Sequence, residues 1–124
     1  MSIECLHESA EVLSETTKTL HRAIVSLIEE LEAIDWYTQR AEACGDDELR
    51  SVLVHNRNEE VEHAMMVLEW IRRHDSAFAT NLDKYLHSNG PITGVESGTS
   101  RILVGKEASA SSAQLGIGSL KGQP

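Results

Sequence analysis

The chain has 124 residues, a formal net charge of −9 and only 4% aromatic residues. This length allows one small domain, and so few aromatic residues make a large independent core improbable, so part of the stability should come from association. The acidic balance argues against nucleic acid and anionic membranes as partners and suits cations, although a merely solvated acidic surface is the more common explanation of net charge alone.

The first predicted element is a long helix over residues 9–44, a stretch without glycine or proline. Its apolar seam, which follows a seven-residue period, comprises Leu13, Leu20, Ile24, Leu27, Leu31 and Ile34. Gly45 suits the position after this helix, and Asp46 or Asp47 suits the N-cap of the next one.

A second helix is predicted over residues 47–73, antiparallel to the first because the connection is short. Its stripe of residues three or four apart comprises Leu49, Leu53, Asn56, Glu60, His63, Val67 and Trp70. A shorter third helix is expected over residues 75–86, ending before Asn89, Gly90 and Pro91.

Residues 94–113 are rich in glycine, serine and alanine, which predicts a flexible linker before a briefly apolar end. The fold class is therefore all-α: an antiparallel two-helix hairpin plus a short third helix. Val25, Ile28 and Trp36 lie away from the main seam of the first helix. A hairpin cannot cover all these faces, so we expect it to pair with a copy of itself and complete a four-helix bundle.

A possible metal site lies within this helical pattern. Glu60 and His63 are three residues apart and so share one helix face, inside an apolar stripe where we expect them to be buried. Glu30 has a comparable position on the first helix, and Tyr37 follows it by one heptad. A glutamate from one helix and a Glu-x-x-His pair from another form half the ligand set of a di-iron site in a helix bundle.

Charge and donor type favour two divalent ions held between two chains. Two copies of Glu30 and Glu60 supply four carboxylates, which balance two ferrous ions while His63 stays neutral. Oxygen donors with one imidazole per metal suit iron or manganese. The simpler alternative is that Glu-x-x-His belongs to a solvated helix face.

A second acidic set comprises Glu29 and Glu32 with Trp36 beside them, about 100° around the helix from Glu30. It is either a transient site through which cations enter or a solvated surface. A solvated face is the favoured explanation for His55, Glu59 and Glu62, which share one side of the second helix. The histidines without companions at ligand spacing are expected to be surface residues; they are His7, His21, His74 and His87. Cys5 and Cys44 have no CxxC spacing, so free thiols in a reducing compartment are expected.

Residues 1–9 show no basic region followed by an apolar stretch, and no apolar run approaches the ~20 residues of a membrane span. We therefore expect neither a secretory signal nor a membrane helix.

Several segments resemble the encapsulated ferritins. They are HRAIVS (21–26), EELEAIDWY (29–37), HNRNEEVEH (55–63), LEWIRR (68–73) and GPIT (90–93). The likeness covers about residues 7 to 93. The end of the chain, LGIGSLKG (115–122), resembles the peptide that docks cargo inside encapsulin shells. The resemblance implies an extension over 1–8, a ferritin-like domain over 9–93, a linker over 94–113 and a targeting peptide over 114–124.

The resemblance also implies roles for particular residues and an assembly. Glu30, Glu60 and His63 match the family's ferroxidase ligands, and Tyr37 matches a tyrosine that lines that site. The residues that match the proposed site of metal entrance are Glu29 and Glu32, flanked by Trp36. An annular decamer built from dimers is implied, located in the cytoplasm inside the encapsulin nanocompartment.

The expected function is a ferroxidase that oxidises Fe(II) to Fe(III) with dioxygen at an inter-subunit di-iron site. Its mineral product would be stored in the shell lumen. Two alternatives are an iron-binding or metal-chaperone oligomer without catalysis, and a structural helical dimer in which Glu60 and His63 form a hydrogen-bonded pair.

Overall fold

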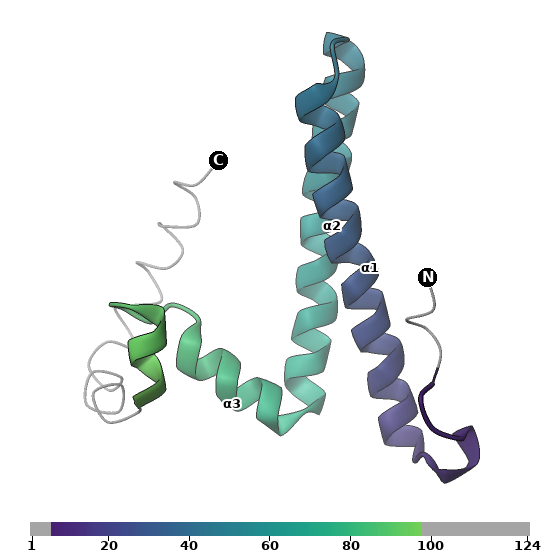
Figure 1. Cartoon of the computed structure of the whole chain (residues 1–124), viewed down its shortest axis with the longest axis vertical. Helices are drawn as coiled ribbons and strands as arrows, with labels where there is room; N and C mark the ends of the chain where they lie inside the picture. The colour runs from purple at the N-terminus through teal and green to yellow at the C-terminus, as the bar shows by residue number, and fades with distance from the viewer. Residues whose placement is uncertain (1–5, 98–124) are drawn as a thin grey trace. The chain divides into compact units, whose positions relative to one another are not determined.

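The computed structural model describes residues 6–97. In that range it contains three α-helices, two short 3-10 helices and no strand, which confirms the all-α prediction (Figure 1). The elements in chain order are η1 (Ala10–Val12), α1 (Glu15–Ala43), α2 (Asp47–His74), α3 (Ser76–Tyr85) and η2 (Ile92–Ser97). The chain divides into two units after Asp75, and α1 and α2 both belong to the first.

The start of α1 differs from the sequence prediction. A helix beginning at residue 9 is wrong, because Ser9 begins only the short turn η1 and Leu13 is extended. The Ser14 side chain accepts a hydrogen bond from the backbone N–H of Thr17 at 3.1 Å. This N-cap satisfies one of the amides that have no partner in the first turn, so α1 starts at Glu15.

A three-residue connection turns α1 back into α2, so the two helices lie side by side and antiparallel (Figure 1). The Asp46 carboxylate accepts from the backbone N–H of Leu49 at 2.7 Å, which is the predicted N-cap of α2. The Arg50 guanidinium donates to the carbonyl of Cys44 in the same turn. Gly45 does not adopt a positive φ, so the turn does not use it as a left-handed helix cap.

The interior of the hairpin is thin and is not centred on the predicted seams. Ala64 and Ile71 of α2 are fully buried, and Val25 and Ala41 are the buried residues of α1. Val25 was expected away from the seam, whereas the seam residue Leu31 is 50% exposed. An apolar helix face is about 100° wide, and its residues alone do not say which edge meets the neighbouring helix.

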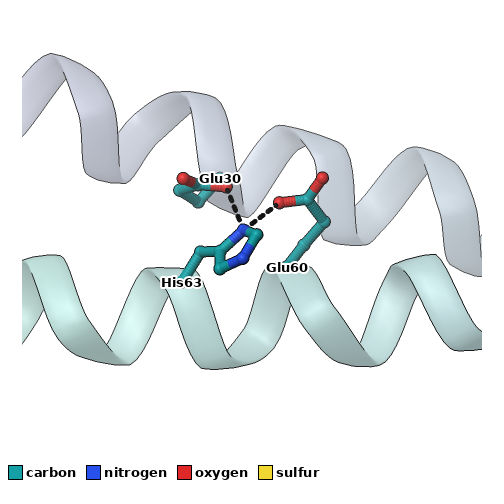
Figure 2. Close-up of side chains that lie close together, drawn as sticks. All are labelled: Glu30, Glu60 and His63. Carbon is teal, nitrogen blue, oxygen red and sulfur yellow. Dashed lines mark hydrogen bonds and ion pairs between the residues drawn. The ribbon is translucent and has the colours of Figure 1, made fainter.

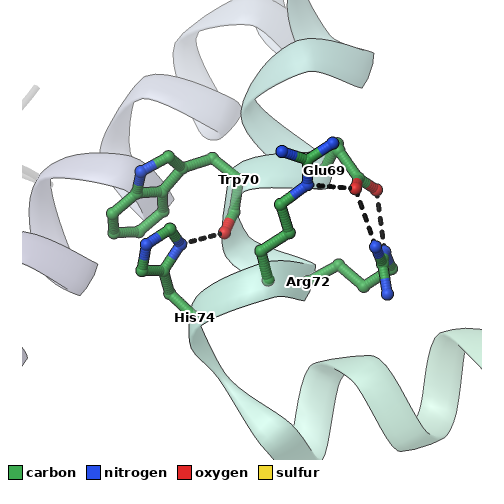
Figure 3. Close-up of polar contacts among 5 residues, drawn as sticks. Glu69, Trp70, Arg72 and His74 are labelled. Carbon is green, nitrogen blue, oxygen red and sulfur yellow. Dashed lines mark hydrogen bonds and ion pairs between the residues drawn. The ribbon is translucent and has the colours of Figure 1, made fainter.

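The last turn of α2 is held by local polar contacts (Figure 3). The Glu69 carboxylate accepts from Arg72 Nε at 2.8 Å and from Arg73 Nε at 2.6 Å, and these two arginines lower the pKa of Glu69 to about 2. The His74 ring stacks on Trp70 at 3.9 Å between centroids, and its Nδ1 donates to the Trp70 carbonyl at 2.8 Å. Basic residues here also favour the helix dipole, so α2 ends at His74.

The second unit contains α3 and η2. Val95 of η2 is buried, and Lys84 Nζ donates to the carbonyl of Glu96 at 3.4 Å. Gly90 has a φ of 80°, a conformation that glycine adopts without penalty, and it precedes Pro91 between these elements.

Residues 94–97, the beginning of the predicted linker, lie in η2. The rest of that linker, the targeting peptide and Cys5 fall outside the described residues. Cys44 is a free thiol. No helix within residues 6–97 combines the length and hydropathy needed to cross a bilayer.

Candidate metal centre

Three of the predicted ligands meet between the two long helices. Glu30 comes from α1 and reaches toward Glu60 and His63 of α2, as Figure 2 shows. His63 Nδ1 lies 3.0 Å from Glu60 Oε1 and 3.8 Å from Glu30 Oε1. One potential ligand atom from each residue lies within 4.8 Å of the other two. Among the described residues, this is the only such group of three or more histidine, cysteine, aspartate or glutamate side chains.

The local packing explains why these side chains converge. Glu60 and His63 project from the same face of α2 because residues three apart are neighbours on a helix. Ala64, the next residue, is fully enclosed, which places this turn of α2 against α1. Its single methyl group allows the two backbones to approach closely enough for Glu30 to reach across.

The side chains are half-buried rather than buried as the sequence predicts. The exposed fractions are 23% for Glu60, 27% for Glu30 and 43% for His63. The two helices of one hairpin therefore leave part of each of these side chains open to solvent.

The two carboxyls are electrostatically coupled. A hydrogen bond to Glu60 raises the pKa of Glu30, and partial burial and the negative charge of Glu60 raise it further. The same hydrogen bond lowers the pKa of Glu60, and His63 lowers it as well. Hydrogen bonding to Glu60 raises the pKa of His63. Two carboxylates this close disfavour joint ionisation, so Glu30 keeps the shared proton more readily.

The donor set fits a divalent first-row metal. Ligand atoms about 2.0–2.2 Å from such an ion lie at most about 4.4 Å apart, and the limit of 4.8 Å here is close to that. Oxygen with one imidazole nitrogen suits iron and manganese. A bound cation would also offset the repulsion between the two carboxylates.

The residues from one chain match half of the ligand pattern of a bundle di-iron site. Glu30 is the single glutamate from one helix, and Glu60 with His63 is the Glu-x-x-His pair from the next. The apolar surface is also incomplete, because Leu31 and Trp36 of α1 and Met65 and Met66 of α2 are all about half exposed. Both features are compatible with association of the hairpin with further copies of itself.

Tyr37 and Trp36 lie beyond the ligand group along α1. Tyr37 is half-buried, and the Arg40 guanidinium lies over its ring at 5.5 Å and over the Trp36 ring at 5.9 Å. Both distances fall within the range of cation–π contacts. Arg40 is not among the residues predicted from sequence, although its spacing of three and four residues from these rings is a recognisable helical signal.

The other acidic candidates do not gather into a comparable group within residues 6–97. Glu29 is exposed and lines a shallow hollow together with Lys18 and Arg22, while Glu32 is half-buried. Their role in cation entrance stays a prediction. His55, Glu59 and Glu62 lie on an exposed side of α2, which agrees with a solvated face.

Comparisons with known proteins place these residues in a family context. The chain matches the model of the EncFtn-like family over residues 5–89. It is 52% identical over 123 residues to the encapsulated ferritin-like protein of Rhodospirillum rubrum, covering 94% of this chain and 88% of that protein. It is 44% identical over 94 residues to the ferritin-like protein of Thermotoga maritima, covering 76% of this chain and 82% of that protein.

A solved structure shows the same arrangement of helices. The crystal structure of protein ne0167 from Nitrosomonas europaea is 56% identical and superposes with a TM-score of 0.68. The match covers 70% of this chain and 96% of that chain.

Proposed function

Because the chain belongs to the EncFtn-like family, we propose that it is a ferroxidase, with Fe(II) as substrate, at a di-iron site shared between two copies. The observation that carries this proposal is the convergence of Glu30, Glu60 and His63 from two helices to within 4.8 Å. Each ferrous ion loses one electron to dioxygen, which is the oxidant, and leaves as Fe(III) for mineral growth.

The side chains have separate tasks in this reaction. Glu30 and Glu60 supply negative charge that stabilises the ferric product more than the ferrous substrate, which favours loss of the electron. His63 supplies a nitrogen donor whose ring is held by its contact with Glu60 at 3.0 Å. Tyr37 would line the site, and Glu29 and Glu32 beside Trp36 would bind cations on their way to it.

Assembly follows from the half-complete site. A second hairpin would add another Glu30, Glu60 and His63 and would cover the half-exposed apolar residues of α1 and α2. Two chains are the minimum for this site. We extend the proposal to an annular decamer by resemblance to the encapsulated ferritins.

Delivery to a shell is the second part of the proposal. The Rhodospirillum rubrum relative is named an encapsulated ferritin-like protein, and its match extends over 94% of this chain. We propose that residues 115–122 bind an encapsulin shell protein, so that the enzyme works inside a nanocompartment in the cytoplasm. A chain truncated before Leu115 should not be packaged when co-expressed with the shell protein, and equal packaging would contradict this part.

The ferroxidase proposal is tested with single substitutions. Glu60→Ala and His63→Ala should each abolish rapid Fe(II) oxidation, measured as oxygen consumption after addition of ferrous iron. Glu42→Ala, which removes an exposed carboxylate elsewhere on α1, is the matched control and should keep the wild-type rate. Wild-type rates in both site variants would disprove the assignment of these ligands.

Two further measurements separate the alternatives. Stoichiometric iron without oxygen consumption would indicate a metal-holding module. No bound metal after loading would indicate that the contact between Glu60 and His63 is purely structural.

A further inference from the structure

A polar network joins α1 to α2 beside the ligand group. Arg57 Nε of α2 donates to Thr38 Oγ1 of α1 at 3.2 Å. The Thr38 hydroxyl donates in turn to the backbone carbonyl of Ile34 at 2.6 Å. At the other end, Arg57 Nη1 donates to Asn58 Oδ1 at 3.2 Å. The network therefore runs from the surface of α2 to the backbone of α1.

The ends of this network lie one helical turn from the proposed ligands. Arg57 precedes Glu60 by three residues on α2, and Ile34 follows Glu30 by four residues on α1. Any shift of one helix along the other that stretches the bond between Arg57 and Thr38 also changes the distance between the Glu30 and Glu60 carboxyls. Neither Arg57 nor Thr38 belongs to the group of ligand atoms.

Few large side chains are buried between these two helices. Of their four buried residues, Ala41 and Ala64 have small side chains that interlock weakly, and only Val25 and Ile71 are larger. A slip by one residue moves a helix by about 1.5 Å. A metal centre tolerates displacements of only about 0.5 Å, so packing of this kind leaves the ligand geometry underdetermined.

We propose that Arg57 and Thr38 are positioning residues that set the register of α1 and α2 for the metal centre. This inference rests on the proposed function, because it needs a metal bound by Glu30, Glu60 and His63. Thr38 acts as the fixed point: its proton is held by the Ile34 carbonyl, which leaves its oxygen free to accept from Arg57. The hydrogen bond from the Arg57 guanidinium to Thr38 then fixes the turn of α2 that carries Glu60 relative to α1.

The test is a double-mutant cycle on the full-length chain with Co²⁺ as the metal probe. Thr38→Val keeps the shape of the side chain but removes the acceptor, and Arg57→Met keeps an unbranched side chain but removes the donor. Each should weaken Co²⁺ binding by about 3- to 10-fold, the loss of one hydrogen bond of about 0.7–1.4 kcal/mol. The double variant should be no weaker than either single variant, because both remove the same interaction.

Thr38→Ser is the matched control because it keeps the hydroxyl, and it should bind Co²⁺ as the wild type does. The visible absorption spectrum of bound Co²⁺ should change in Thr38→Val and Arg57→Met but not in Thr38→Ser, since it reports ligand geometry rather than fold stability. Wild-type affinity and spectrum in Thr38→Val, or losses that multiply in the double variant, would overturn the positioning role. If the wild type itself bound no Co²⁺ or Fe²⁺, the proposed function and this inference would both fail.

Discussion

Replacing Glu30 by glutamine should have opposite effects on the stability of the metal-free and of the metal-loaded protein. Glu30→Gln removes one negative charge beside Glu60 and keeps a side chain that can donate a hydrogen bond to it, as protonated Glu30 does. The metal-free variant should therefore be more stable than the wild type. The same substitution removes a carboxylate ligand, so the metal-loaded variant should be less stable.

The magnitude follows from the separation of the ligand atoms. At 4.8 Å, the upper limit on the separation of these atoms, two unit negative charges repel by about 0.9 kcal/mol in water and by about 3.5 kcal/mol at an effective dielectric constant of 20. Water reaches both carboxyls, which are 27% and 23% exposed, so the lower end applies. A gain of about 1 kcal/mol in the metal-free protein corresponds to roughly 4–8 °C in Tm for a domain of this size.

The effect should depend on pH in a defined direction. The pKa of Glu30 is raised above its usual 4.5, so ionising this group in the folded protein costs stability as the pH rises above that value. The advantage of Glu30→Gln should be largest at about pH 8 and disappear at about pH 4, where the wild-type side chain is mostly protonated. Saturating metal should raise the wild-type stability by about 2.7 kcal/mol at 100 times Kd, and the variant much less.

Thermal unfolding at fixed protein concentration, with chelator and with Co²⁺, measures both effects. Glu42→Gln removes an exposed charge elsewhere on α1 and should change either Tm far less. A metal-free Glu30→Gln protein that melts at or below the wild type would refute the repulsion. An equal gain in Tm from Co²⁺ in both proteins would refute the assignment of Glu30 as a ligand.

Three further predictions concern stability and titration. Ile71→Ala, at a fully buried position, should lower the free energy of unfolding by about 2–5 kcal/mol in urea, whereas Ile92→Ala, at an exposed one, should stay within about 0.5 kcal/mol. Asp46→Ala should cost about 1 kcal/mol by the same measurement, because the amide of residue 49 loses its acceptor, and Asp46→Asn should restore most of it. The Glu69 carboxyl should titrate with a pKa of about 2 when followed by ¹³C NMR. Its contribution to stability is therefore present above about pH 4.5 and lost toward pH 2. An unchanged Glu69 pKa in Arg72→Ala would show that Arg72 does not lower it.

Local signals in the sequence are sufficient for much of the hairpin. The second helix was predicted over residues 47–73 and spans Asp47–His74, because its N-cap at Asp46 and its basic last turn are local features. The start of the first helix was wrong because Ser9 and Ser14 are equally suitable caps, and only the three-dimensional structure shows that η1 intervenes.

The convergence of the proposed ligands was predictable for a related reason. Glu60 and His63 share a face by spacing alone, and a short connection forces α2 back along α1 toward Glu30. The degree of burial was not predictable from one chain, because it depends on what covers the group. The bond between Arg57 and Thr38 joins positions 19 residues apart in sequence and has no local signature.

The fully enclosed methyl group of Ala64 limits how this protein can change. A larger apolar residue at that position is the ordinary route to a better-filled interior, yet here it would wedge the helices apart and carry Glu30 away from the imidazole of His63. A substitution that filled the space around residue 64 would therefore weaken metal binding by Glu30 and His63. Selection for a sturdier hairpin therefore has to act elsewhere, on the surfaces where one copy meets the next.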